Sequence, residues 1–88
     1  MPYTVLIAPA ARRDLKRIHG AIRRRVADAI DDLAANPRPH GSAKLTGTDD
    51  LYRVRVGDYR ILYKIHDDQL IVLIVRVGQR KDIYGKGK

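Results

Sequence analysis

The chain has 88 residues, enough for one domain with a modest hydrophobic core. Its 18 lysines and arginines outnumber 10 acidic residues, and the net charge of +8 predicts a polyanionic partner: nucleic acid, an acidic protein segment or a membrane surface. The absence of cysteine excludes disulfides and thiolate chemistry. The longest apolar run, Leu70–Val75, is too short to cross a bilayer, and no signal peptide is visible. We therefore expect a cytoplasmic protein without a membrane anchor.

The first half of the chain predicts a strand followed by two helices. Tyr3–Ile7 alternates between two sets of side chains, which is typical of a short strand. Pro9 suits the first turn of a helix that ends at His19-Gly20, and a second helix ends at Asn36-Pro37. Because the break between them is short, we expect an antiparallel helical hairpin. Its many basic residues are interpreted as solvated surfaces, with contact to ribosomal RNA as the alternative.

Three consecutive strands are predicted in the second half, after a loop over residues 38–48. Leu51–Val56 and Tyr59–Ile65 alternate in polarity, and Gly57-Asp58 between them is a hairpin signal. Leu70–Val77 is an almost continuous apolar run, which predicts a central strand covered on both faces. We expect a single α+β domain over residues 1–88: a strand, the helical hairpin, then a three-stranded antiparallel meander, with residues 85–88 as a frayed tail.

The first predicted hairpin brings arginines together. A two-residue loop at Gly57-Asp58 places Arg55 directly opposite Arg60, with Arg53 diagonal to Arg60. Like charges directly opposite in a sheet are destabilising. The pattern therefore leaves two interpretations open, an ordinary solvated strand face or a site that holds an anion.

The second hairpin can also be given a register, with a turn at residues 66–69. Placing Ile65 opposite Leu70 would put Arg60 opposite Val75. An apolar strip would then adjoin the arginines. We expect the C-terminal segment or a partner chain to cover that strip.

The residues permit only a narrow range of chemistry. The three histidines are scattered without the spacing of metal ligands, no glycine-rich phosphate loop follows a strand, and no serine nucleophile stands beside a histidine. What remains is a set of arginines and one tyrosine: Arg53, Arg55, Arg60, Arg80 and Tyr84. Guanidinium groups match phosphate geometry, and RNA carries its own nucleophile in the 2′-hydroxyl. Cleaving RNA without metal or cofactor needs only positioning, charge stabilisation and proton transfer.

Two stretches carry a family resemblance. Tyr59-Arg60-Ile61-Leu62-Tyr63 and the pattern from Val77-Gly78-Gln79-Arg80 to Tyr84 resemble the RelE toxins of bacterial and archaeal toxin–antitoxin modules, and the similarity extends over nearly the whole chain. The resemblance implies a compact microbial ribonuclease-like fold. It also implies a metal-independent endoribonuclease, an mRNA interferase that cuts codons in the ribosomal A site and inhibits translation.

The resemblance also assigns roles to residues. It implies that Arg60 holds the scissile phosphate, that Arg80 donates a proton to the 5′-oxygen and that Tyr84 stacks on or orients a base. Arg53 and Arg55 stand where relatives carry lysines, one of them the proposed base. Because arginine stays protonated, Arg55 is expected to polarise the 2′-hydroxyl or the phosphate, or the base lies elsewhere. The expected RNA-binding residues are Arg53, Arg55, Arg60, Lys64, Arg80 and Lys81.

The resemblance implies two partners: mRNA on the ribosome, with contacts to 16S ribosomal RNA, and a RelB-like antitoxin. An acidic, amphipathic antitoxin segment would pair with the arginines, and we expect it to displace the tail around Ile83-Tyr84. Two other functions stay open at this point. One is a non-enzymatic ParE-type inhibitor of DNA gyrase, and the other is a degenerate toxin that only binds its antitoxin.

Overall fold

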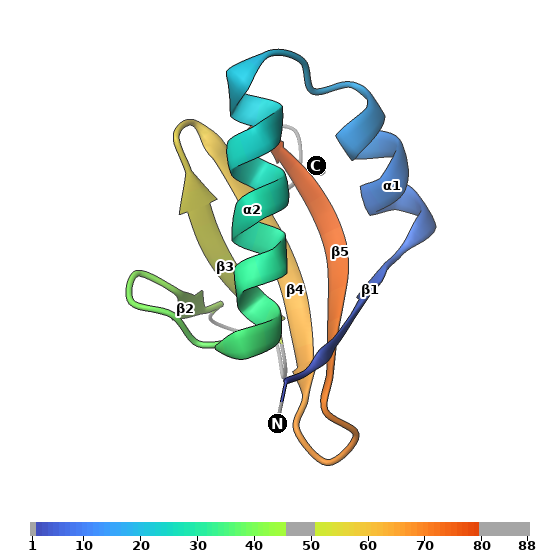
Figure 1. Cartoon of the computed structure of the whole chain (residues 1–88), viewed down its shortest axis with the longest axis vertical. Coiled ribbons are helices and arrows are strands. Elements are labelled where there is room, and N and C mark those ends of the chain that lie inside the picture. Colours follow the sequence, from blue (N-terminus) through green and yellow to red (C-terminus); the bar gives the residue numbers. More distant parts are fainter. Residues whose placement is uncertain (1, 46–50, 80–88) are drawn as a thin grey trace.

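The computed structural model describes residues 2–45 and 51–79, and within them it shows a mixed sheet with two helices (Figure 1). The strand order is β1-β5-β4-β3-β2. The predicted α+β class and the antiparallel meander are confirmed. The elements are β1 (Thr4–Ile7), α1 (Pro9–Lys16), α2 (Ala21–Ala35), β2 (Ala43–Lys44), β3 (Leu51–Val56), β4 (Tyr59–His66) and β5 (Ile71–Gln79).

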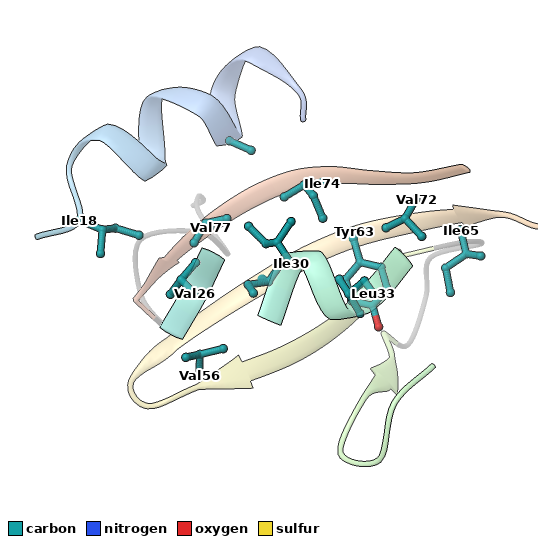
Figure 2. Packing of buried hydrophobic residues seen from close by; sticks show 12 residues of the cluster. Ile18, Val26, Ile30, Leu33, Val56, Tyr63, Ile65, Val72, Ile74 and Val77 are labelled. Atoms are coloured by element: carbon teal, nitrogen blue, oxygen red, sulfur yellow. The ribbon is translucent and has the colours of Figure 1, made fainter. Parts of the chain in front are cut away.

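The hydrophobic core lies between the helices and one face of the sheet (Figure 2). α2 contributes Val26, Ile30 and Leu33, whose spacing places them on one side of the helix. Alternate residues of β4, among them Ile61 and Tyr63, meet them from the sheet. Both helices pack on this face, and neither of them covers the opposite face of the sheet.

The two helices follow each other in opposite directions, as predicted for a helical hairpin (Figure 1). α1 ends at Lys16, slightly before the predicted break, and Gly20 with a φ of 79° precedes α2. A positive φ suits glycine, which lacks the Cβ that would clash there. Neither helix is both long and apolar enough to span a bilayer, as judged over the described residues.

β5 is an interior strand of the sheet, because β4 pairs with one of its edges and β1 with the other. The two strands run parallel, with Thr4 opposite Ile71 and Ile7 opposite Ile74. The prediction that β5 is covered on both faces is only partly right. Its helix-facing residues are buried, whereas Leu73 on the other face is only half-buried, because both helices lie on one side.

The register of the first hairpin is confirmed. Val56 pairs with Tyr59 and Arg55 pairs with Arg60 across a two-residue loop. Gly57 has a φ of 59°, while Asp58 is not among the residues with positive φ. This is the pattern of a type II′ turn, whose twist matches that of the paired strands.

The predicted register of the second hairpin is wrong. Ile65 pairs with Val72 instead of Leu70, and Arg60 pairs with Gly78 instead of Val75. Leu70 belongs to the turn, where its φ of 55° is left-handed, and a bulge between Leu62 and Tyr63 shifts the pairing further. The apolar strip therefore does not adjoin Arg60 through Val75.

One short strand was missed. The segment predicted as loop over residues 38–48 contains β2, which pairs with β3 through Ala43–Arg53 and Lys44–Tyr52. Two residues are too few to produce a recognisable alternation, so the sequence carried no strand signal there.

Candidate functional site: an arginine face on the open side of the sheet

Four basic residues lie on the helix-free face of the sheet, and we call them the arginine face: Arg53, Arg55, Arg60 and Lys64. Their neighbours Val54, Ile61 and Tyr63 belong to the core on the helix side. Successive strand residues point to opposite faces, so the basic residues point away from the helices. The structure therefore brings together the sheet residues that were predicted to bind RNA.

The members of the arginine face differ in exposure. Arg55 and Lys64 are exposed, whereas Arg53 and Arg60 are half-buried. The Nε atom of Arg53 is buried without a hydrogen-bond partner. A buried donor without an acceptor costs free energy, and an anionic ligand would remove that cost.

An apolar residue of β4, Leu62, lies between two arginines of the neighbouring strands. Leu62 is opposite Arg53 on one side and Arg76 on the other, and only 4% of its surface is exposed. An apolar residue at this position reduces the water beneath the guanidinium groups. Charge interactions with a bound anion are stronger in such surroundings than in bulk water.

None of the described residues on this face of β3 and β4 is acidic. The face thus presents cations to whatever lies over it, and its guanidinium groups can form paired hydrogen bonds with phosphate oxygens. Over the described residues, no group of three or more potential ligand side chains is placed to hold a metal ion. Arg80, Lys81 and Tyr84, the remaining predicted site residues, lie outside the residues that the structure describes.

A buried ion pair joins α1 to β5, and sequence reasoning missed it. Asp14 accepts hydrogen bonds from Arg76 Nε at 2.8 Å, from Arg76 Nη2 at 3.2 Å and from the backbone N–H of Val77 at 2.9 Å. β1 ends at Ile7, so the edge of β5 beyond Ile74 lacks a strand neighbour there. The Asp14 carboxylate supplies the acceptor that a neighbouring strand would otherwise provide.

The same contacts set the charge of Asp14. Burial is the largest single influence and raises the pKa of this carboxyl, but the hydrogen bonds from Arg76 and from Val77 oppose it. The positive charges of Arg76 and Arg17 act in the same direction. The pKa of Asp14 is therefore held below its ordinary value, and the group is ionised at neutral pH.

A second unpredicted cluster lies at the β4–β5 turn. Asp67 pairs with Arg38, whose Nη2 is 2.9 Å from Oδ2, and accepts a hydrogen bond from the Tyr3 hydroxyl at 2.6 Å. The Arg38 guanidinium also lies 5.3 Å from the ring centroid of Tyr52. Hydrogen bonds from Arg38 and from Tyr3 lower the pKa of Asp67 to about 2. This cluster ties the N-terminal segment and the loop after α2 to the sheet.

The sequence held a signal for the first of these missed features only. Asp14 falls between Ala11 and Leu15, two apolar residues of α1 that pack in or against the core, and Arg76 interrupts the apolar run of β5. A charge at a predicted core position indicates a partner, because buried charges need one. Arg38 and Asp67, by contrast, stand in predicted loops where charged residues are ordinary.

Comparisons with known proteins identify the family of the chain. The family described as "ParE toxin of type II toxin-antitoxin system, parDE" matches residues 5–84. The chain is 41% identical to toxin RelG of Mycobacterium tuberculosis over 88 residues, which covers 96% of this chain and 98% of that protein. A more distant relative is the mRNA interferase toxin RelE of Escherichia coli, 23% identical over 92% of this chain and 86% of that protein.

Solved structures of similar proteins include toxin–antitoxin complexes. The RelBE2 complex of M. tuberculosis matches with a TM-score of 0.80 and 34% identity, over 91% of this chain and all of that chain. The archaeal RelE–RelB complex of Pyrococcus horikoshii also matches with a TM-score of 0.80, at 32% identity over 93% of this chain and 99% of that chain.

Proposed function

The chain is a RelE-type toxin of the RelE/ParE family of type II toxin–antitoxin systems, and from that premise we propose that it is a ribosome-dependent endoribonuclease. Its substrate is the mRNA codon in the ribosomal A site, and its effect is the arrest of translation. The observation that supports this best is the arginine face, where Arg55 and Arg60 lie directly opposite each other on β3 and β4. The interferase name of the E. coli relative supports the reaction class.

The proposed reaction uses the RNA's own nucleophile. The 2′-oxygen forms a bond to phosphorus while the bond from phosphorus to the 5′-oxygen breaks, which leaves a 2′,3′-cyclic phosphate and a 5′-hydroxyl. Arg60 holds the phosphate, and Arg53 and Arg55 stabilise the additional negative charge that develops on it. Arg80 donates the proton to the leaving 5′-oxygen, and Tyr84 orients a base of the codon.

No arginine can serve as the base in this scheme. Arginine is protonated at rest, so Arg53 and Arg55 polarise the 2′-hydroxyl and the phosphate without removing a proton. Arg80 starts protonated as well, gives its proton to the more basic 5′-alkoxide as that group leaves, and regains a proton from water. The proton of the 2′-hydroxyl then passes to solvent or to a phosphate oxygen. Positioning and electrostatic stabilisation supply the remaining rate enhancement.

The proposal includes an antitoxin of the RelB type as the physiological inhibitor. Similar toxins have been solved in complex with RelB proteins. The net charge of +8 favours an acidic inhibitor segment that lies over the arginine face, because opposite charges steer association and pair at the interface.

The decisive experiment supplies purified ribosomes with a programmed A-site codon and maps the mRNA ends by primer extension. We expect cleavage within the codon and a 2′,3′-cyclic phosphate terminus. Arg60→Ala should lower the cleavage rate by about 10²–10³-fold, as removal of one charge-stabilising donor typically does. Lys44→Ala removes one positive charge from β2, away from the arginine face, and serves as the control. If Arg60→Ala and Lys44→Ala cleave equally fast, the arginine face is not the active site.

A second candidate function is inhibition of DNA gyrase, because the matching family is described by its ParE toxin. A supercoiling assay with purified gyrase separates the two candidates. Inhibition of supercoiling together with intact mRNA on programmed ribosomes would replace the nuclease proposal with this one.

A further inference from the structure

The C-terminal ends of α1 and β5 lie at the same end of the molecule (Figure 1). A pocket lies between them. Its volume is about 450 Å³, within the range of small-ligand sites. The lining residues come from α1 and the segment after it, from the start of β4 and from the end of β5: Asp14, Arg17, Ile18, Tyr59, Arg76, Val77, Gly78 and Gln79. The buried side chains of Ile18 and Val77 form its apolar part, and Figure 2 shows both at this end of the core.

One wall of the pocket is rigid and electrically neutral. Asp14 is only 9% exposed, and its carboxylate is held by Arg76 and by the backbone of Val77. Its negative charge is thus matched by Arg76. An anion that enters the pocket does not meet an uncompensated carboxylate.

The mouth of the pocket carries an additional cation. Arg17 is exposed at the C-terminal cap of α1, and it makes no ion pair with any described acid. Arg17 acts on Asp14 only through its charge, because the Asp14 carboxylate is bound by Arg76. Arg17 therefore adds a positive charge to the lining and is available to an incoming phosphate.

The remaining lining can receive a nucleobase. Tyr59 is half-buried and presents an aromatic ring, and Gln79, opposite it in the sheet, presents an amide that can donate and accept hydrogen bonds. Stacking on an aromatic ring and hydrogen bonding to a base edge are the ordinary means by which proteins hold unpaired RNA bases. A phosphate-binding cation stands beside them in Arg17.

We infer that this pocket binds one nucleotide of the RNA strand that the arginine face cleaves. The inference rests on the proposed function. It adds a subsite at the start of β4 and the end of β5, on the face of the sheet opposite the arginine face. Tyr59 and Arg60 are consecutive and point to opposite faces of β4, and on β5 their partners are Gln79 and Gly78. An RNA strand that rounds this end of the sheet meets the pocket directly after the arginine face.

Binding can be measured apart from cleavage with a 2′-O-methyl hexanucleotide RNA, which lacks the nucleophile. We expect amide shifts in NMR spectra of the full-length chain at both Arg60 and Gln79. Arg17→Gln should weaken this binding about tenfold, as loss of one phosphate contact does. Lys44→Gln makes the same change in net charge at the opposite end of the molecule and should weaken it less than twofold. Equal weakening by the two variants would overturn the inference.

Two further variants test the base-binding part. Tyr59→Phe keeps the aromatic ring and should bind as the wild type does, whereas Tyr59→Leu removes stacking and should weaken binding about tenfold. Thermal unfolding of both variants shows whether the core has been kept. If a folded Tyr59→Leu binds the hexanucleotide as tightly as Tyr59→Phe, the pocket holds a phosphate alone and the nucleotide assignment is wrong.

The same variants separate this inference from the proposed function. Cleavage of ribosome-bound mRNA that is equally efficient in Arg17→Gln and Lys44→Gln would refute the subsite and leave the nuclease standing. Hexanucleotide binding that depends on Arg17, with no cleavage on ribosomes, would refute the nuclease and leave the pocket standing. With both correct, Arg17→Gln raises the protein concentration needed for half-maximal cleavage about tenfold, whereas Lys44→Gln raises it less than twofold.

Discussion

Arg55 and Arg60 lie directly opposite each other across the β3–β4 hairpin, on the face of the sheet that carries no helix. Such a pair opposes folding, because like charges at facing strand positions repel. We expect Arg55→Thr to raise the free energy of unfolding by about 0.2–1 kcal/mol while lowering RNA cleavage. Urea unfolding at low and high salt measures the first effect, which added salt should diminish.

Lys64→Thr is the matched control for this prediction. Lys64 lies on the same face, but its cross-strand neighbours are Leu51 and Leu73, so its removal relieves no facing charge. An equal gain in stability from both substitutions would show that threonine propensity, and not charge repulsion, is responsible.

Arg55→Lys tests whether the reaction lacks a side-chain base. A lysine can lose its proton, and the neighbouring positive charges of Arg53 and Arg60 would lower its pKa. We expect this variant to cleave mRNA about 10²-fold faster than the wild type at alkaline pH, the size of a typical general-base contribution. The measurement is the single-turnover rate on programmed ribosomes as a function of pH. A variant that is no faster at any pH would indicate that a base already acts elsewhere.

Asp14→Asn should destabilise the fold. The substitution removes the negative charge that Arg76 faces at 2.8 Å, and Arg76 is partly buried. We expect a loss of about 1–3 kcal/mol in the free energy of unfolding at neutral pH. A double-mutant cycle with Arg76→Gln isolates the pair, and a coupling energy near zero would contradict the role assigned to it.

Acid should weaken the same ion pair. The pKa of Asp14 in the folded state lies below its ordinary value. Its stabilising contribution is therefore complete above the unfolded-state pKa and is lost as the pH falls through the folded-state pKa. Asp14→Asn should remove this part of the acid sensitivity. Unfolding curves of both proteins over the acid range show whether the difference between them shrinks as predicted.

Asp67→Asn should change the titration of a neighbouring tyrosine. The hydrogen bond to Asp67 is the main reason that the pKa of Tyr3 is raised. With a neutral amide in its place, the pKa of Tyr3 should fall toward its ordinary value. NMR of the Tyr3 ring carbons against pH measures this. An unchanged Tyr3 titration would show that the contact with Asp67 is absent in solution.

The two hairpins show what determined how much of the sheet could be predicted. The first register was predicted correctly because Gly57 supports a two-residue turn, and a fixed turn sets every later pair. The second failed because Leu70 adopts a left-handed conformation that its residue type does not indicate. The bulge at Leu62 and Tyr63 likewise has no local signature in the sequence.

The candidate site, too, could be predicted from the sequence only in part. Strand alternation was enough to place Arg53, Arg55 and Arg60 on one face, because that property is local. The pocket depends on where α1 meets the end of β5, so it required a tertiary contact between Asp14 and Arg76. The periodicity of apolar residues along a sequence does not determine which residues pair when they lie so far apart in the chain.

The parallel pairing of β1 with β5 has a consequence for the synthesis of the protein. Thr4–Ile7 has no strand to join until Ile71–Ile74 has been made. A chain leaves the ribosome from its N-terminus, so the helices too must wait for β4 and β5 to complete the sheet beneath them. We therefore expect the nascent chain to remain incompletely folded, and the toxin inactive, until β5 has emerged from the ribosome that makes it.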